Sequence, residues 1–195
     1  SQGTYPLKGL HMLFEALPVL IRRFPDVQVY IAGPDITKQE TLLDRIKRTT
    51  YGAYLKKLIV QYQLQQHLNF LGPLSAEQMC KQYLSANVFV LPSMIENSSN
   101  SLGEAMLLGL PCVASCVGGA QDLIKDREDG FLYPFNEPYM LAHYIGKIFE
   151  NEQCALSLSK KARNNALKTY DRQGILKETM AAYEIILRSR KEETD

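Results

Sequence analysis

Two glutamates that flank a Ser- and Asn-rich segment are the residues of this sequence best suited to chemistry. Glu96 and Glu104 follow the apolar run Val88–Leu91, in a segment that begins at Pro92 with the order PSMIENSSNSLGEAM. Ser101 followed three residues later by Glu104 fits a capping box, so we expect a helix to begin there. The first amides of a helix lack intrahelical acceptors and attract phosphate. The segment therefore predicts an anion site bordered by carboxylates that can accept hydrogen bonds from hydroxyl groups.

Each glutamate also has an ordinary structural explanation. Glu104 could serve only as a helix cap. Glu96 could be a solvated loop carboxylate, which is the usual state of an isolated acidic residue. The spacing alone leaves both interpretations open at each position.

Alternating strands and helices must position this segment. The predicted strands cover 27–33, 68–71, 88–91, 111–115 and 130–133, and the predicted helices cover 10–24, 39–66 with a break at 49–52, 76–84, 102–108 and 121–125. Continuous apolar runs are typical of strands covered on both faces, and strands that alternate with helices favour parallel pairing through right-handed crossovers. We therefore predict an α/β fold with a doubly wound, mostly parallel, Rossmann-like sheet. Three extra helices should follow Pro138, and the charged tail from Arg188 to Asp195 should be frayed.

Ligands of open parallel sheets bind beyond the carboxyl ends of the strands. The informative residues are therefore those that follow Gly33, Leu71, Leu91, Ser115 and Tyr133. The segment after Leu91 is the richest of these in polar side chains, so we expect the site to be centred there.

Length and charge restrict the class of protein. The 195 residues, 46% of them hydrophobic, suit one domain, and the net charge of +1 gives no general attraction to nucleic acid. No apolar run approaches the roughly 20 residues of a membrane span, and four cysteines without a CxxC pair fit a reducing compartment, so we expect a cytoplasmic chain.

The chain starts without Met and enters a helical pattern almost at once, so we expect it to be a fragment.

No metal or cofactor is predicted. The three histidines, His11, His67 and His143, lie outside any motif, and no Asp-x-Asp or His-rich spacing occurs. An isolated histidine on a helix is more often structural than a ligand, and we interpret these three in that way.

The ordered motifs of the chain resemble the retaining GT-B glycosyltransferases of family 4, the group-1 class. The motifs that carry the resemblance are Lys8-Gly9, Phe70-Leu71-Gly72, Leu91-Pro92-Ser93, the Glu-x7-Glu element Glu96 to Glu104 with Ala105-Met106, Gly109-Leu110-Pro111, Gly118-Gly119 with Asp122, and Asp129-Gly130-Phe131-Leu132. The resemblance covers nearly the whole chain, residues 1–195. It implies the C-terminal, donor-binding half of a GT-B fold, with the N-terminal acceptor domain lying outside this chain.

The same resemblance assigns roles to individual residues. Lys8 and Glu96 are the catalytic candidates, since Lys8 would contact the donor diphosphate and Glu96 would face the donor sugar. Glu104 would bind the ribose hydroxyls. The full set of implied donor-binding residues is Gly33, Phe70, Leu71, Gly72, Leu74, Asn100, Ser101, Leu102, Glu104, Gly118 and Gly119. One position departs from the family, because Gln2 stands where an arginine is common, so Lys8 would carry more of the phosphate charge.

The implied reaction is transfer of a sugar, with retained configuration, from a nucleotide diphosphate donor to the hydroxyl of a glycan or lipid-linked acceptor. UDP is the nucleotide that the family uses most often. The transfer would serve polysaccharide or glycoconjugate synthesis in the cytoplasm or at the inner face of the membrane. Since the N-terminal domain contributes the acceptor site, and the last helix often crosses back to it, the isolated chain should bind the donor but barely catalyse.

Three other classes of protein could use a similar nucleotide-binding fold. A GT-B nucleotide-sugar epimerase or phosphorylase would reuse the same donor chemistry, but the Glu-x7-Glu context disfavours both. An oxidoreductase dinucleotide domain is disfavoured because no Gly-x-Gly-x-x-Gly opens a helix after a strand. A non-catalytic nucleotide-binding module with the same Rossmann-like fold is the third, since fold alone does not define activity.

Overall fold

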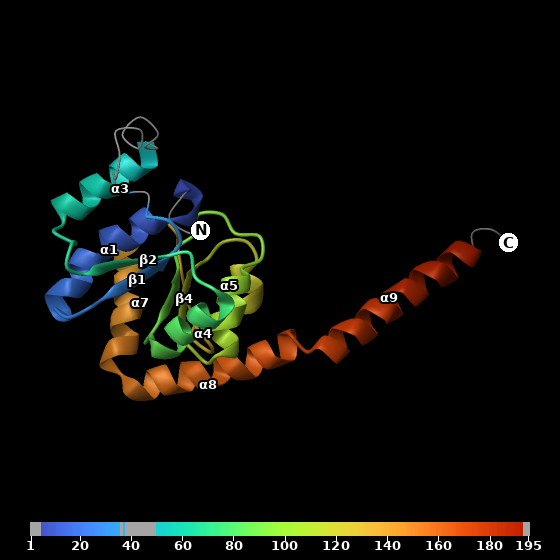
Figure 1. Cartoon of the computed structure of the whole chain (residues 1–195). Helices are drawn as coiled ribbons and strands as arrows, with labels where there is room; N and C mark the ends of the chain where they lie inside the picture. The colour runs from blue at the N-terminus through green and yellow to red at the C-terminus, as the bar shows by residue number, and fades with distance from the viewer. Residues whose placement is uncertain (1–4, 36, 38–49, 193–195) are drawn as a thin grey trace.

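The computed structural model describes residues 5–35, 37 and 50–192, and these form an α/β domain (Figure 1). The elements in chain order are η1 (Pro6–Lys8), α1 (Leu10–Arg23), β1 (Val29–Ala32), α3 (Thr50–Gln61), β2 (Leu68–Gly72), α4 (Ala76–Ser85), β3 (Phe89–Leu91), α5 (Asn100–Leu107), β4 (Cys112–Ser115), α6 (Ala120–Leu123), β5 (Phe131–Tyr133), α7 (Pro138–Glu150), α8 (Glu152–Thr169) and α9 (Arg172–Glu192). The predicted α/β class and the alternation of strands and helices are confirmed.

The strands pair in parallel, as predicted, but in two groups. β1 pairs with β2, and β3, β4 and β5 form a second sheet in that order. The middle strand, β4, is buried at all four positions, as expected for a strand covered on both faces. Parallel pairing brings the carboxyl ends of β3, β4 and β5 to one edge, so the segments after Leu91, Ser115 and Tyr133 lie side by side.

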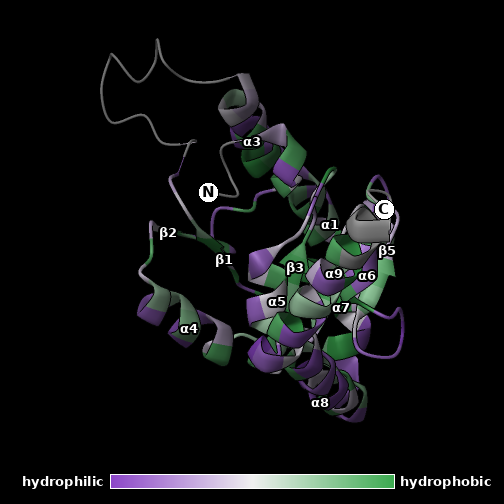
Figure 2. Ribbon diagram, turned by 90° about the vertical axis from the view of Figure 1, so that its right-hand side faces the viewer, coloured by the Kyte–Doolittle hydropathy of each residue, from purple (hydrophilic) through white to green (hydrophobic). Residues whose placement is uncertain are grey.

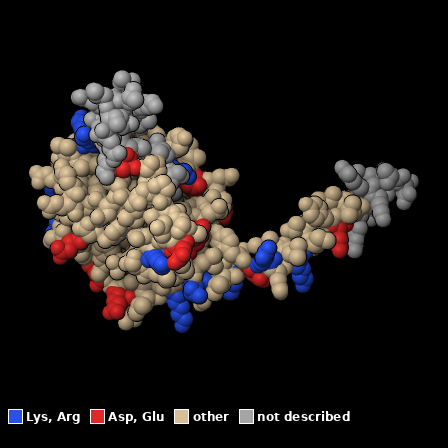
Figure 3. Space-filling model, viewed as in Figure 1, with Lys and Arg blue, Asp and Glu red and all other residues tan. Residues whose placement is uncertain are grey.

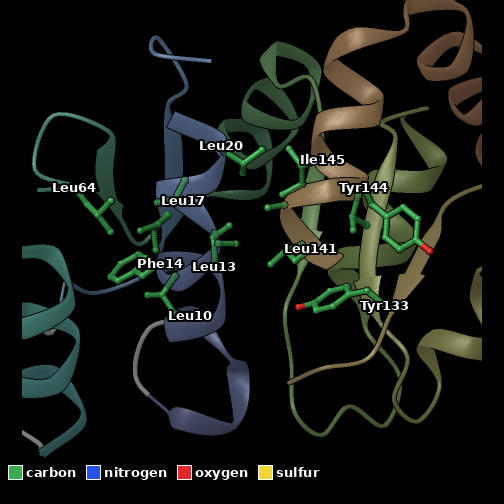
Figure 4. Packing of buried hydrophobic residues seen from close by; sticks show 14 of the residues in the cluster. Leu10, Leu13, Phe14, Leu17, Leu20, Leu64, Tyr133, Leu141, Tyr144 and Ile145 are labelled. Atoms are coloured by element: carbon green, nitrogen blue, oxygen red, sulfur yellow. The ribbon is translucent and has the colours of Figure 1, made fainter. Parts of the chain in front are cut away.

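Packing of α1 against α7 provides the larger core (Figure 4). Leu13, Leu17 and Leu20 recur at helical spacing on α1 and are buried. In Figure 4, Leu13 and Leu20 lie on the side of α1 toward Leu141 and Ile145 of α7, and Leu17 lies toward Phe14. Phe14, on the neighbouring side of α1, is fully buried. This contact fixes α1, and with it the Lys8-Gly9 turn that precedes α1.

A second core lies under α5 and α8. Leu102 and Met106 of α5 pack in the same buried cluster as Ala162 and Ala166 of α8. The hydropathy colours show the result, with green faces turned inward and purple faces turned to solvent on these helices (Figure 2). The helix that follows the Glu96 loop is thereby anchored along its length by α8.

Two local predictions are wrong. A break in the helical pattern was expected at 49–52, but Thr50, Tyr51 and Gly52 form the first turn of α3, where Tyr51 packs into the core. Residues 39–49 of that predicted helix lie outside the described residues. The tail expected to fray from Arg188 is instead helical to Glu192, and residues 193–195 lie outside the described residues.

The last helices leave the body of the domain. α8 crosses the domain, and α9 extends away from it (Figure 1). Lysine and arginine side chains lie along α8 and the first part of α9 (Figure 3). α9 also exposes large apolar side chains, namely Ile175, Leu176, Met180, Tyr183, Ile185, Ile186 and Leu187, which are 48–68% exposed. Among the described residues, none of the helices combines the length and apolar character needed to cross a membrane.

Candidate donor-binding site

The turn before α1 is in direct backbone contact with the segment that follows β3. Gly9 adopts a left-handed conformation with φ of 69°, and a Cβ at this position would lie 1.6 Å from the carbonyl oxygen of Pro92. The amide of Met94 donates to the carbonyl of Leu7 at 2.8 Å. Only glycine permits this approach. Lys8 is therefore held beside the loop that carries Glu96.

Lys8 and Glu96, the two predicted catalytic residues, form an ion pair. Lys8 Nζ lies 2.9 Å from Glu96 Oε2, and the two side chains are 30% and 9% exposed. Ser93 Oγ donates to the same carboxylate oxygen at 3.1 Å. Ser93 is itself fully buried, and its carbonyl accepts a hydrogen bond from Ser115 Oγ at the end of β4. The Glu96 carboxylate is thus oriented by a charged group and a buried hydroxyl.

The Gly118-Gly119 turn closes the other side of this loop. A Cβ on Gly118 would lie 1.8 Å from the carbonyl oxygen of Glu96, and one on Gly119 would lie 2.0 Å from that of Asn97. The amide of Gly119 donates to the same Asn97 carbonyl at 3.0 Å. Close packing alone therefore requires both glycines, and their contact with a ligand remains a prediction.

The start of α5 differs from the capping box expected from the sequence. Ser99 is the N-cap, in extended backbone, and its hydroxyl accepts the Leu102 amide at 3.3 Å. Ser101 lies inside the helix instead, and its hydroxyl is 3.0 Å from Ser99 Oγ. The capping-box prediction at Ser101 and Glu104 is therefore wrong.

This correction changes which amides of α5 are free. The Leu102 amide is already used by the Ser99 cap. In the described part of the chain, the amides of Asn100 and Ser101 have no protein acceptor. The Asn100 and Ser101 amides are therefore the two at the start of α5 that could still meet a phosphate.

Glu104 is exposed on α5 and does not cap the helix. Its Oε2 accepts a hydrogen bond from Tyr83 Oη of α4 at 3.3 Å. Tyr83 is not among the predicted site residues, because a tyrosine at helical spacing on an amphipathic helix is expected to be a core residue. Nothing in the local sequence connects Tyr83 to a carboxylate far along the chain.

The remaining predicted donor-binding residues lie at the ends of β1 and β2. Gly33 is buried, with φ of 116°, and its amide donates to the Gly72 carbonyl at 2.8 Å. Phe70 packs against the larger core, while Leu71 and Leu74 are half-buried. No hydrogen bond or ion pair between described residues joins this group to Lys8 and Glu96. Gln2 lies outside the described residues.

Two of the histidines have hydrogen-bond partners within the protein. His11 Nδ1 lies 3.1 Å from Tyr51 Oη, and His67 Nδ1 lies 2.8 Å from the Val27 carbonyl. Burial lowers the pKa of His11, although the nearby Glu15 carboxylate opposes this. All four cysteines are free. Over residues 5–35, 37 and 50–192, no three His, Cys, Asp or Glu side chains are grouped to hold a metal ion.

The fold and the site together define a parallel α/β domain in which Lys8, Glu96 and the start of α5 lie beyond the carboxyl end of β3. Residues 4–168 match the protein family described as glycosyl transferases group 1. The match spans most of the chain, and the chain therefore belongs to this family.

Related proteins agree with this assignment. The phosphatidyl-myo-inositol mannosyltransferase of Mycobacterium tuberculosis is 30% identical over 94% of this chain and 46% of its own length. Anabaena HepE, solved in complex with UDP, is 26% identical with a TM-score of 0.74, over 91% of this chain and 46% of that protein. The chain thus spans about half the length of these relatives.

A third similarity concerns the fold alone. The structure of the C-terminal domain of LpcC, a group 1 family glycosyl transferase of Francisella tularensis, has a TM-score of 0.70 at 18% identity. The similarity covers 85% of this chain and 80% of that domain. The chain and the single LpcC domain therefore have nearly the same extent.

Proposed function

We propose that this chain is the C-terminal, donor-binding half of a retaining GT-B glycosyltransferase of family 4. It would hold a nucleotide diphosphate sugar, with UDP as the nucleotide, for transfer to an acceptor hydroxyl. Two comparisons support this proposal: the chain has the extent of the LpcC C-terminal domain, and HepE was solved with UDP.

The observation that carries the proposal is the pairing of Lys8 with Glu96 beside the start of α5. As the bond from sugar to diphosphate breaks, negative charge grows on the leaving diphosphate. A fixed lysine and the free amides of Asn100 and Ser101 would stabilise that charge in the transition state more than in the ground state. The diphosphate would compete with Glu96 for Lys8, so donor binding would free Glu96 to face the positive sugar ring.

Glu104 would bind the other end of the donor. Its carboxylate is exposed and accepts from Tyr83, which leaves lone pairs for the ribose hydroxyls of the nucleotide. In this arrangement the two carboxylates of the Glu-x7-Glu element have different roles, one at the sugar and one at the ribose. Gly33, Phe70, Leu71, Gly72 and Leu74 would lie along the diphosphate and base.

The acceptor would be bound by the N-terminal domain of the same polypeptide. The exposed apolar side chains of α9 support contact with that domain, since large exposed apolar patches mark interaction surfaces. The acceptor would be a glycan or lipid-linked intermediate of polysaccharide or glycoconjugate synthesis, at the cytoplasmic face of the membrane. Without the acceptor site, this chain alone would bind donor but show no turnover.

Calorimetric titration of this chain with UDP, GDP, ADP and NAD tests the proposal, with Glu104→Ala as the main variant. We expect one nucleoside diphosphate to bind and the variant to weaken it about 5- to 150-fold, the value of a charge-assisted hydrogen bond of ~1–3 kcal/mol. Glu178→Ala is the matched control, because Glu178 is also an exposed helical glutamate but lies on α9, away from the proposed donor site. It should leave the affinity unchanged.

Other outcomes contradict the proposal in distinct ways. Binding of NAD alone would indicate a dinucleotide domain of an oxidoreductase. Diphosphate binding that is insensitive to Glu104→Ala would remove Glu104 from the donor site. Sugar transfer by this chain alone would contradict the role given to the N-terminal domain.

A further inference from the structure

The exposed carboxylate of Glu104 is approached by a buried phenol from another helix. Tyr83 of α4 is 6% exposed. Its hydroxyl lies 3.3 Å from Glu104 Oε2 and 3.3 Å from the Ser101 carbonyl oxygen. Both acceptors are on the first turns of α5. The single hydroxyl proton of Tyr83 therefore links α4 to the residues with which α5 would meet a donor.

Packing explains the ring of Tyr83 but not its hydroxyl. The ring belongs to the smaller core and meets Phe89 edge-on, with 5.8 Å between the ring centroids. A phenylalanine would make the same contacts. Burial raises the pKa of Tyr83, and the Glu104 charge raises it further. The phenol is therefore protonated at neutral pH and can donate to the carboxylate.

A second phenol limits the space on the other side of the helix start. Tyr170, at the end of α8, packs on Gly103, where an added Cβ would lie 2.1 Å from the phenol oxygen. Burial raises the pKa of Tyr170, with the Glu104 charge as the second cause. Tyr170 thus packs against the backbone just before Glu104, while Tyr83 bonds to the Ser101 carbonyl one turn earlier.

We propose that Tyr83 is a positioning residue that orients the Glu104 carboxylate for the ribose diol of the donor nucleotide. This inference rests on the proposed function, because it concerns the same site. An exposed glutamate on a helix has several rotamers open to it and loses that freedom when it binds a ligand. The hydrogen bond from Tyr83 selects one orientation before the ligand arrives. It occupies one lone pair of Oε2 and leaves Oε1 free for a ribose hydroxyl.

Tyr83→Phe tests this role, since it removes one oxygen and keeps the ring. The probes are the best-binding diphosphate among UDP, GDP and ADP and its 2′,3′-dideoxy analogue, each titrated by calorimetry. We expect the dissociation constant of the ribonucleotide to rise about 3- to 10-fold, the effect of one hydrogen bond. The dideoxy analogue cannot use Glu104, so its dissociation constant should stay within about twofold. Tyr183→Phe on exposed α9 is the matched control and should change neither value.

A double variant separates a positioning role from a structural one. In the Glu104→Ala background, Tyr83→Phe should cause no further loss of ribonucleotide affinity, because the group it orients is absent. A loss of similar size in both backgrounds, or equal weakening of the ribonucleotide and its dideoxy analogue, would overturn the inference. So would an unchanged affinity in Tyr83→Phe while Glu104→Ala weakens binding, and in that case the proposed function would stand. An unchanged affinity in Glu104→Ala would count against the proposed function itself.

Discussion

Gly9 and Gly72 offer a comparison in which backbone conformation is held constant and steric contact varies. Their φ angles are 69° and 70°, so an alanine at either position is strained to the same degree. A Cβ on Gly9 would lie 1.6 Å from the Pro92 carbonyl oxygen, whereas a Cβ on Gly72 would meet nothing within 4 Å. Gly9→Ala and Gly72→Ala therefore separate the cost of the contact from the cost of the conformation.

The expected losses follow from these two terms. A left-handed conformation costs an alanine about 1–2 kcal/mol, and this is the whole effect expected for Gly72→Ala. In Gly9→Ala, Cβ and the Pro92 oxygen must also separate by about 1.8 Å, from 1.6 Å to the 3.4 Å of an ordinary contact. Overpacking of this kind adds about 1–3 kcal/mol. The free energy of unfolding should thus fall by about 2–5 kcal/mol in Gly9→Ala.

The difference in the free energy of unfolding is measured by urea titration of the wild type and both variants at one pH. The comparison requires equal m-values. Gly9→Ala should be less stable than Gly72→Ala by at least about 1 kcal/mol. Equal losses would refute the reasoning, because they would show that the turn before α1 and the segment after β3 separate without cost. In that case the position of Lys8 would not depend on the glycine beside it.

Three further changes test other parts of the structure. Ser93→Ala removes the hydroxyl that donates to Glu96, and should lower the free energy of unfolding by about 0.5–1.5 kcal/mol in urea titrations; an unchanged value would exclude that bond. Ser75→Ala removes the hydroxyl of the α4 capping box with Gln78, and should lower the free energy of unfolding by about 1 kcal/mol in urea titrations. An unchanged value would mean that the cap is dispensable. Burial raises the pKa of Asp129, so ionisation costs more in the folded chain than in the unfolded one. Relative to Asp129→Asn, wild-type stability should fall as pH rises from roughly 4, the unfolded value, through the raised pKa; the opposite slope in pH-dependent unfolding would contradict the raised pKa.

Local pattern was sufficient to predict most elements of the fold. The apolar spacing of α1 and the continuous run of β3 are properties of adjacent residues, and both were predicted within a few residues of their observed bounds. Leu13, Leu17 and Leu20 recur at helical spacing along α1, and all three are buried in the larger core. These signals are local because hydrogen-bonded elements repeat over short distances along the chain.

The start of α5 shows where local pattern is insufficient. Ser98, Ser99 and Ser101 are all acceptable caps by residue type, and Ser101 has the acidic partner of a capping box. The structure selects Ser99, whose backbone is extended. Glu104 is instead bonded to Tyr83, 21 residues away in sequence. Residue type alone therefore does not distinguish these caps, and the Tyr83 partner of Glu104 lies outside any short window of sequence.

The ion pair at the centre of the site has the same origin. Lys8 and Glu96 are 88 residues apart, and their contact depends on how the turn before α1 meets the segment after β3. Resemblance to a family placed both residues at a donor site, but it gave no reason to expect them to bind one another. Their pairing follows from the backbone contact at Gly9, and the spacing of apolar residues along the sequence does not reveal that contact.

Backbone atoms of facing glycines pack closely against the segment after β3 on both sides. The carbonyl groups of Pro92, Glu96 and Asn97 each occupy space that a Cβ on a facing glycine would need. Ile95 and Ser98, between and after them, have exposed side chains. A library that varies Ile95 and Ser98 while keeping the facing glycines could therefore change what the segment meets without moving Glu96. The architecture separates the residues that fix the site from those available for altering its selectivity.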